Sequence, residues 1–301
     1  MASGLVLIDK PKGWTSHDVV AKLRGIAGTR RVGHSGTLDP MATGLLLIGI
    51  NSATKLLTYL VGASKTYEAT IRLGANTITD DAEGETLEVA KAEAVRAITA
   101  EQIESALESL RGEIMQVPSS VSAIKVDGER AYAKVRGGDE VKLAARPVSI
   151  YRFEITSEPQ FEQSEGSVFL DFNATIECSS GTYIRALARD LGRQLSVGGH
   201  LTALRRTKIN NYAVEDAQQI DGLTRESLKV MPMVAAAESA FAIHHVSDQE
   251  VIDLRHGKRI DSQGLTGSEI AAVNNGELVA MLESVGQQLK STVVFVGESD
   301  D

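Results

Sequence analysis

The stretch from Arg31 to Gly44 constrains this 301-residue chain more than any other segment. It places one carboxylate, that of Asp39, among three glycines and a proline. Glycine permits positive φ angles, and proline fixes φ and removes a hydrogen-bond donor, so the stretch is predicted to be a shaped loop rather than a helix. Apolar runs flank it, at Leu5–Ile8 and Leu45–Ile48, so we expect the loop to lie on a buried scaffold, where catalytic groups are often placed. An aspartate that only caps a turn is the alternative, because Asp-Pro is also a common turn signal.

The composition favours a globular protein without disulfides or membrane spans. Hydrophobic residues make up 43% of the chain, which suffices for a packed core. Cys178 is the one cysteine, which excludes an internal disulfide and a multi-cysteine metal site. The first residues lack the basic segment of a signal peptide, and no apolar run reaches the roughly 18 residues of a transmembrane helix. We expect a cytoplasmic protein with no membrane association and no metal.

The net charge of −9 argues against an extensive nucleic-acid surface, since Lys and Arg supply most of the affinity for phosphate. The charge is unevenly distributed, because residues 231–301 carry 11 acidic and 4 basic side chains, whereas the first 230 residues carry 29 and 27. Local basic patches can still bind phosphate on an acidic protein. Such patches are predicted at Arg30-Arg31, at residues 125–146, at the helix-spaced Arg185, Arg189 and Arg193, and at residues 205–208.

Apolar periodicity predicts both helices and strands. A buried strand is expected at residues 5–8. A helix is expected from Ser16 to about Ala27, with Thr15 or Ser16 as N-cap. A strand or a helix start is expected at 45–50, and a helix at 53–60. Period-two alternation predicts strands at 67–73 and 168–176, and helical spacing predicts helices after Thr99 and from Ile184. Residues 80–88 are acidic and are expected to form a loop.

A domain boundary is expected near residues 228–232. An Ala-rich link at 234–242 follows, and then short strands with glycine-containing turns, of which Asn275-Gly276 is a good hairpin signal. We therefore expect two domains, one over residues 1–230 and a small β-barrel over residues 233–301.

Four ordered segments resemble the motifs of the TruB-type pseudouridine synthases, bacterial enzymes that modify uridine in the T-arm of tRNA. The first is the Asp39 stretch, which contains every fixed position of the family pattern Gly-His-x-Gly-x-Leu-Asp-Pro-x-Ala-Thr-Gly. The others are Asp9–Ser16, Lys65–Tyr67 with Leu73-Gly74, and Gly181–Arg185 with Asp190–Gly192. One motif could match by coincidence, but four in the expected order indicate membership of the family.

The resemblance implies an α+β fold, with a mixed, mainly antiparallel sheet in the catalytic domain and a C-terminal PUA-like β-barrel. It implies an RNA-contacting insertion at about residues 118–146, where Pro118-Ser119 and Val135–Gly137 depart from the family's usual sequence. The implied activity is isomerisation of tRNA uridine 55 to pseudouridine, by base flipping, cleavage of the glycosidic bond, rotation of the base and formation of a carbon–carbon bond. The reaction needs no energy source and no redox change, so no cofactor is expected. The implied partner is the T-arm of tRNA, and we expect a monomer with no obligatory protein partner.

The resemblance also assigns roles to individual residues. Asp39 would be the catalytic carboxylate, either as nucleophile at the sugar or as base for the 2′ proton. Arg185 would pair with Asp39 and keep it ionised, and Tyr67 would stack on the extruded uracil. The other expected substrate-binding residues are Lys10, His34, Tyr183, Leu204, Arg205 and Arg206. Among them, His34 would fill or support the position that the flipped uridine leaves.

Other interpretations of these residues stay open on the sequence alone. Taken singly, Tyr67 and Leu204 would be assigned to the core, and His34 to the surface. His244 and His245 are adjacent and would point to opposite sides of a strand, so they make a poor metal pair. The alternative functions are a guide-RNA-dependent synthase acting on ribosomal RNA, against which the acidic end at 296–301 argues, and a non-catalytic RNA-binding or folding module, against which the intact catalytic residues argue.

Overall fold

The computed structural model describes residues 2–119, 125–126, 129–130, 143–164 and 166–295. The chain divides into two compact units, one made of residues 1–63 and 208–301, the other of residues 64–207. The expected RNA-contacting insertion lies largely outside the described residues, as does the acidic end at 296–301. None of the described helices combines the length and apolarity that a membrane span needs.

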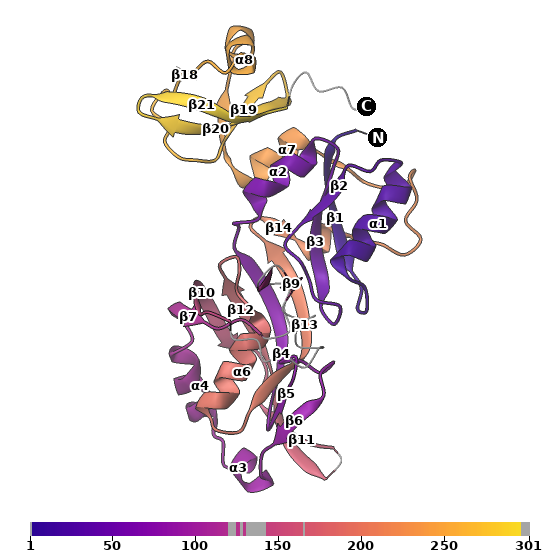
Figure 1. Ribbon diagram of the computed structural model, residues 1–301, viewed down its shortest axis with the longest axis vertical. Coiled ribbons are helices and arrows are strands. Elements are labelled where there is room, and N and C mark those ends of the chain that lie inside the picture. Colours follow the sequence, from indigo (N-terminus) through magenta and orange to yellow (C-terminus); the bar gives the residue numbers. More distant parts are fainter. Residues whose placement is uncertain (1, 120–124, 127–128, 131–142, 165, 296–301) are drawn as a thin grey trace. The chain divides into compact units, whose positions relative to one another are not determined.

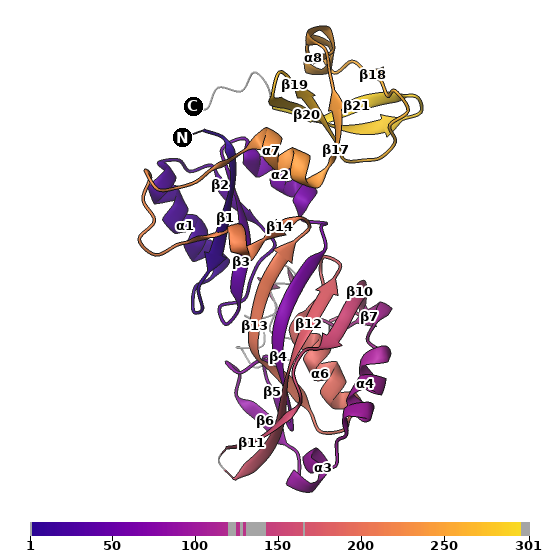
Figure 2. The ribbon, with the colours of Figure 1, turned by 180° about the vertical axis from the view of Figure 1, so that it is seen from behind.

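The first unit begins with a small sheet whose two faces are both covered by helices. β1 (Gly4–Lys10) pairs antiparallel with β3 (Thr43–Ile50), which also pairs with β2 (Val32–Ser35). The short strands β15 (Gln218–Gln219) and β16 (Met231–Pro232) pair with β1. Helices α2 (Ala53–Leu60) and α7 (Met233–Ala240) lie on one side of this sheet and α1 (Ser16–Ala27) on the other (Figure 2). Alternate residues of β1 and β3 pack in the core cluster on each side. Because both faces are buried, the two strands are continuously apolar.

Helix α1 has the ends that its sequence predicts. Thr15 is the N-cap, and its side chain accepts from the backbone N–H of Asp18, whose carboxylate accepts from the Thr15 N–H in return. This reciprocal capping box satisfies two amide groups that would otherwise be unpaired. Gly28 ends the helix in the left-handed region at φ 67°, which is where glycine is favoured.

The rest of the first unit is a curled five-stranded sheet with a short helix, α8 (Asp248–Arg255), and it fits the expected PUA-like domain. Its strand order is β17 (Ala242–His245), β19 (Ile270–Asn274), β20 (Glu277–Val285), β21 (Gln288–Val294) and β18 (Ile260–Asp261). The predicted hairpin is confirmed, since Asn275 and Gly276 join β19 to β20 with φ angles of 49° and 78°. The Ala-rich segment forms the helix α7, whose Ala236 and Ala237 are fully buried against the first sheet.

The second unit is built on a long, mainly antiparallel sheet (Figure 1). Its central strands are β4 (Lys65–Leu73) and β12 (Ser167–Cys178), which pair along their full overlap, and β10 (Arg146–Ile155) and β7 (Gly112–Gln116) extend it. β13 (Gly199–Ile209) lies on the other side of β4, and β11 (Gln160–Ser164) folds back on β12. Helix α6 (Ile184–Gln194) packs on β4, α4 (Ala100–Glu108) packs on α6, and α3 (Ala92–Arg96) packs on β12. The α+β class is therefore confirmed.

The smaller elements complete both units. β5 (Ala75–Thr77) and β6 (Thr86–Val89) form a two-stranded ribbon, as do β8 (Lys125–Val126) and β9 (Glu129–Arg130). β14 (Tyr212–Ala213) pairs with the end of β13 and leads into a 3-10 turn at Val214–Asp216. Two predicted loops are shorter than expected. β2 and β3 take both ends of the Asp39 stretch, which leaves residues 36–42 as loop, and β6 takes residues 86–88 of the acidic segment.

Candidate active site

The loop that carries Asp39 is held by hydrogen bonds from the segment that follows β1, at Gly13 and Ser16. Ser16 is buried, and its hydroxyl donates to the Leu38 carbonyl at 3.2 Å and accepts from the Leu38 N–H at 2.9 Å. The Gly13 N–H donates to the Pro40 carbonyl at 2.8 Å. The residues on both sides of Asp39 are thus tied to the same segment, and its half-buried carboxylate sits on a fixed backbone.

Lys10 strengthens this attachment. Its side chain is fully buried, and Nζ donates to the carbonyls of Pro11 at 3.0 Å, Trp14 at 2.7 Å and Pro40 at 3.5 Å. A buried ammonium requires such partners, because an unpaired buried charge is costly. Lys10 therefore links the turn after β1 to the Asp39 loop.

His34 lies on β2, close to the start of the same loop. It is half-buried, and its ring meets the ring of His17 edge-to-face, with centroids 5.6 Å apart and an interplanar angle of 79°. His17 belongs to the first turn of α1, immediately after Ser16. The first unit thus brings Lys10, His34 and Asp39 onto neighbouring parts of one small scaffold.

The other expected site residues lie in the second unit. Tyr67 is buried on β4 opposite Ile176 of β12, and Leu204 is buried on β13. Arg205 is half-buried, whereas Arg206 is fully buried. Burial and the nearby Arg206 charge lower the pKa of Lys65, at the start of β4, to about 8.

Tyr183 and Arg185 are positioned at the start of α6. Tyr183 is the N-cap, and the side-chain amide of the buried Gln116 both accepts from its N–H at 2.9 Å and donates to its carbonyl at 3.1 Å. Arg185 is 5% exposed; it donates to the Thr79 carbonyl at 2.6 Å and lies 3.3 Å from the Asp81 carboxylate. The helix end and the turn after β5 therefore fix the guanidinium between them.

Two of these supporting residues carry no recognisable signal in the sequence. Nothing marks Gln116, and Asp81 is expected only as part of an acidic loop. A buried ion pair could not be inferred for Asp81, because its partner lies on a helix far along the chain. Asp39 and the segment that holds its loop are both marked by motifs, whereas the residues that hold Arg185 are marked only by their contacts.

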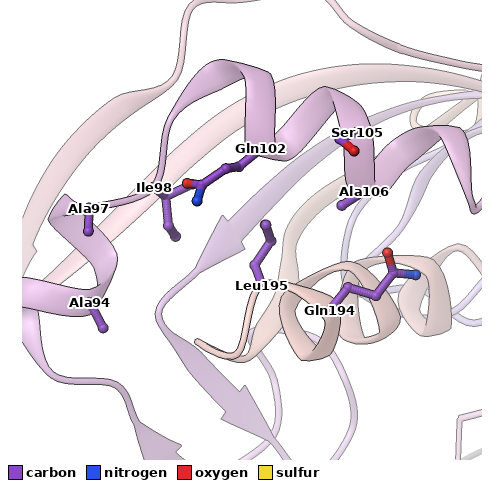
Figure 3. Close-up of a pocket in the computed structure, with 8 residues that line it drawn as sticks. All are labelled: Ala94, Ala97, Ile98, Gln102, Ser105, Ala106, Gln194 and Leu195. Carbon is purple, nitrogen blue, oxygen red and sulfur yellow. The ribbon is translucent and has the colours of Figure 1, made fainter.

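Two cavities of the second unit lie near these elements. One of about 450 Å³ opens between α3, α4 and the end of α6, and Figure 3 shows that its lining side chains are uncharged, Gln102 and Gln194 among them. A carboxylate-dependent reaction has no catalytic group there. The other, of about 530 Å³, is lined in part by Asp80, Arg189 and Arg193. Within the described part of the chain, no cluster of His, Cys, Asp and Glu could hold a metal ion.

Solved structures share this fold. An H/ACA ribonucleoprotein bound to a substrate RNA containing 2′-deoxyuridine aligns with a TM-score of 0.69 and 23% identity, over 97% of this chain and 85% of that chain. A Cbf5-Nop10-Gar1 complex aligns with the same TM-score and 24% identity, over the same shares of the two chains. At these identities the likeness shows the fold alone.

Sequence comparisons show the family. Residues 24–184 match the TruB family pseudouridylate synthase N-terminal domain, residues 185–242 the tRNA pseudouridylate synthase B C-terminal domain, and residues 241–296 the tRNA pseudouridine synthase II C-terminal domain. The tRNA pseudouridine synthase B of Paenarthrobacter aurescens is 53% identical, over 98% of this chain and 96% of the relative. That of an Arthrobacter species is 52% identical, over 100% and 99%. The chain therefore belongs to the TruB family of tRNA pseudouridine synthases.

Proposed function

We propose that this chain isomerises uridine 55 in the T-arm of tRNA to pseudouridine, as a cytoplasmic monomer without a cofactor or an obligatory protein partner. The observation that carries the proposal is the Asp39 loop, whose backbone is tied to Ser16, Gly13 and Lys10 on both sides of the carboxylate. In this proposal residues 1–230 perform catalysis, and residues 233–301 form an RNA-binding module. The names of the full-length relatives support the same substrate class.

In the proposed reaction the N1–C1′ bond of the uridine breaks, the uracil turns, and C5 forms a new bond to C1′. C5 loses its proton and N1 gains one, so the reaction is an isomerisation that consumes nothing. The first step creates positive character at C1′, and a carboxylate stabilises or traps such a centre in glycoside hydrolysis. Asp39 supplies that carboxylate, as nucleophile at C1′ or as base for the 2′ proton.

The other proposed roles follow the needs of this step. Arg185 orients the Asp39 carboxylate, through a bidentate geometry that lysine cannot reproduce. Tyr67 stacks on the uracil, and its hydroxyl assists removal of the C5 proton. A stacked uridine has to be flipped out, at a cost of a few kcal/mol, and His34 occupies the vacated position.

The remaining expected residues surround the base. Tyr183 and Leu204 line its pocket, and Arg205 contacts the RNA. Lys10 and Arg206 are fully buried in the free protein, so we propose that they support the site rather than touch the RNA.

Tritium release from T-arm RNA labelled with 5-³H-uridine tests the proposal directly. Wild type should release tritium, and Asp39→Asn, which removes the charge but keeps the shape, should release none while it still binds the RNA. Asp221→Asn changes an exposed aspartate of the same unit and should retain full activity. RNA binding without release by the wild type would indicate a non-catalytic folding module instead. Release only with added guide RNA and partner proteins would indicate the ribosomal-RNA relative.

A further inference from the structure

Two arginines on one helix meet two consecutive aspartates on one turn in the second unit. Arg185 and Arg189 are one helical turn apart on α6, and Asp80 and Asp81 follow β5. Arg185 lies 3.3 Å from the Asp81 carboxylate, and Arg189 donates from Nη1 to the Asp80 carboxylate at 3.1 Å. The proposed function gives no role to the Arg189–Asp80 pair.

The turn at residues 79–81 has an unfavourable backbone conformation, which hydrogen bonds from other elements stabilise. Asp80 has φ 58°, in the left-handed region that residues other than glycine adopt at a cost in free energy. Its carbonyl accepts from the Leu201 N–H at 3.1 Å, and the preceding carbonyl, that of Thr79, accepts from Arg185 at 2.6 Å. The same turn thus presents both the carbonyl and the carboxylate that fix Arg185.

Arg189 ties this turn to two other elements. Nη2 donates to the Val117 carbonyl at 2.7 Å, just beyond β7, and to the Asp190 carboxylate at 3.0 Å. One guanidinium therefore joins α6, the turn after β5 and the end of β7. A planar guanidinium can make several such bonds at once, and an ammonium cannot reproduce them.

The Asp80 carboxylate is largely buried beside the 530 Å³ cavity. Burial raises its pKa, while the charges of Arg189 and Arg185 act in the opposite direction. An ionised carboxylate in such a place depends on its cationic neighbours. The buried Asp80 carboxylate therefore needs the positive charge of Arg189 beside it, and the pair is not an exposed surface contact.

We propose that Asp80 and Arg189 are positioning residues, which act through the turn at residues 79–81 to hold the Arg185 guanidinium in its reactive orientation. The proposal rests on the proposed function, in which Arg185 orients the catalytic carboxylate. Misplacement of a catalytic group by about 1 Å can lower a rate by about 100-fold, so loss of this support should slow chemistry without weakening RNA binding.

The test measures single-turnover tritium release at saturating T-arm RNA, and RNA affinity separately, for Asp80→Asn and Arg189→Gln. Asparagine tolerates the left-handed region, so Asp80→Asn removes the charge and keeps the turn. Each variant should lose about 10- to 100-fold in rate while the Kd for RNA stays within about twofold. The double variant should be no slower than the slower single variant, because the two residues act as one pair.

Arg152→Gln is the matched control, because Arg152 lies in the same unit on β10, pairs with the exposed Glu154, and is 49% exposed. It should keep its rate within about twofold. Rates within twofold of wild type for both pair variants, or losses that multiply in the double variant, would overturn the proposal. So would a rate loss matched by an equal loss of RNA affinity or of folded protein by circular dichroism. An inactive wild type would instead refute the proposed function.

Discussion

At the scale of single residues, burial distinguishes the arginines of α6 that have structural partners from the one that is exposed. The three arginines of α6 recur every four residues, yet Arg185 is 5% exposed, Arg189 23% and Arg193 77%. Because 3.6 residues complete a turn, each step of four rotates the side chain by about 40° around the helix. The three arginine side chains therefore point progressively from the interior of the second unit to its surface.

Ser16→Ala should slow catalysis and lower stability, although Ser16 lies 23 positions from Asp39 in the chain. The change leaves the buried Leu38 N–H and carbonyl without their shared partner, which should cost about 1–3 kcal/mol in the free energy of unfolding. Denaturant unfolding and tritium release check this, with Ser105→Ala, at an exposed helical position, as control. Unchanged stability and rate would show that the Asp39 loop does not depend on the hydroxyl.

Lys65→Met should stabilise the protein at neutral pH. The pKa of Lys65 is lowered from 10.5 to about 8, so below pH 8 the folded state holds the ammonium at a cost on the order of 3 kcal/mol. Between pH 8 and 10.5 the unfolded chain binds more protons at this site, and stability rises with pH. The advantage of Lys65→Met over wild type should therefore shrink by on the order of 2 kcal/mol between pH 7 and pH 9.5.

The difference between the two proteins is the quantity to measure, by urea unfolding at each pH. Burial also raises the pKa of Tyr212 to about 12, which lowers stability at alkaline pH in both proteins alike. A difference that is independent of pH would contradict the assignment of the shift to Lys65.

At the scale of elements, the placement of α6 depends on a close approach of backbones. A Cβ added to Gly192 would lie 2.1 Å from the Gly198 carbonyl carbon and 2.2 Å from the Gly199 nitrogen. Both atoms belong to the backbone at the start of β13, so they cannot rotate away. Gly192 therefore lets α6 lie against the sheet at the depth that buries Arg185.

Gly192→Ala should destabilise the second unit by more than about 3 kcal/mol, because overpacking against backbone forces the helix outward. Gly25→Ala is the matched control, since Gly25 lies in α1 with no atom within 4 Å of an added Cβ. That change should stabilise its helix by about 0.5–1 kcal/mol. Thermal unfolding of both variants is the measurement, and equal melting temperatures would contradict the argument.

At the scale of the whole molecule, the C-terminal sheet shares its core with the N-terminal sheet of the first unit. Ala271, Met281 and Phe295 pack in one cluster with Leu56 and Leu57 of α2. The Tyr212 hydroxyl donates to the Ala236 carbonyl at 2.6 Å, and Tyr59 and Thr292 share a hydrogen bond at 2.7 Å. Removal of residues after 232 would expose this core, so point variants are the cleaner way to study the tail.

Met281→Ala should lower the stability of the whole first unit, by about 2–5 kcal/mol, since Met281 is fully buried in the shared cluster. Calorimetry should show the C-terminal sheet and the N-terminal sheet melting together. Val285→Ala, at a 37% exposed position of the same strand, should cost less than about 1 kcal/mol. A separate early transition confined to the C-terminal sheet would contradict a common core.

The sequence by itself determined the elements that local physics specifies. Alternation predicted β4 and β12, and the capping residues at Thr15 and Ser16 predicted the start of α1, because each signal spans only a few neighbouring residues. Its four motifs also identified the family and, through it, the expected site residues. Tertiary structure alone decided that α7 belongs to the core, that Lys10 and Ser16 hold the Asp39 loop, and that Asp80 and Asp81 meet α6. These depend on contacts between residues far apart in the chain, which no local periodicity records.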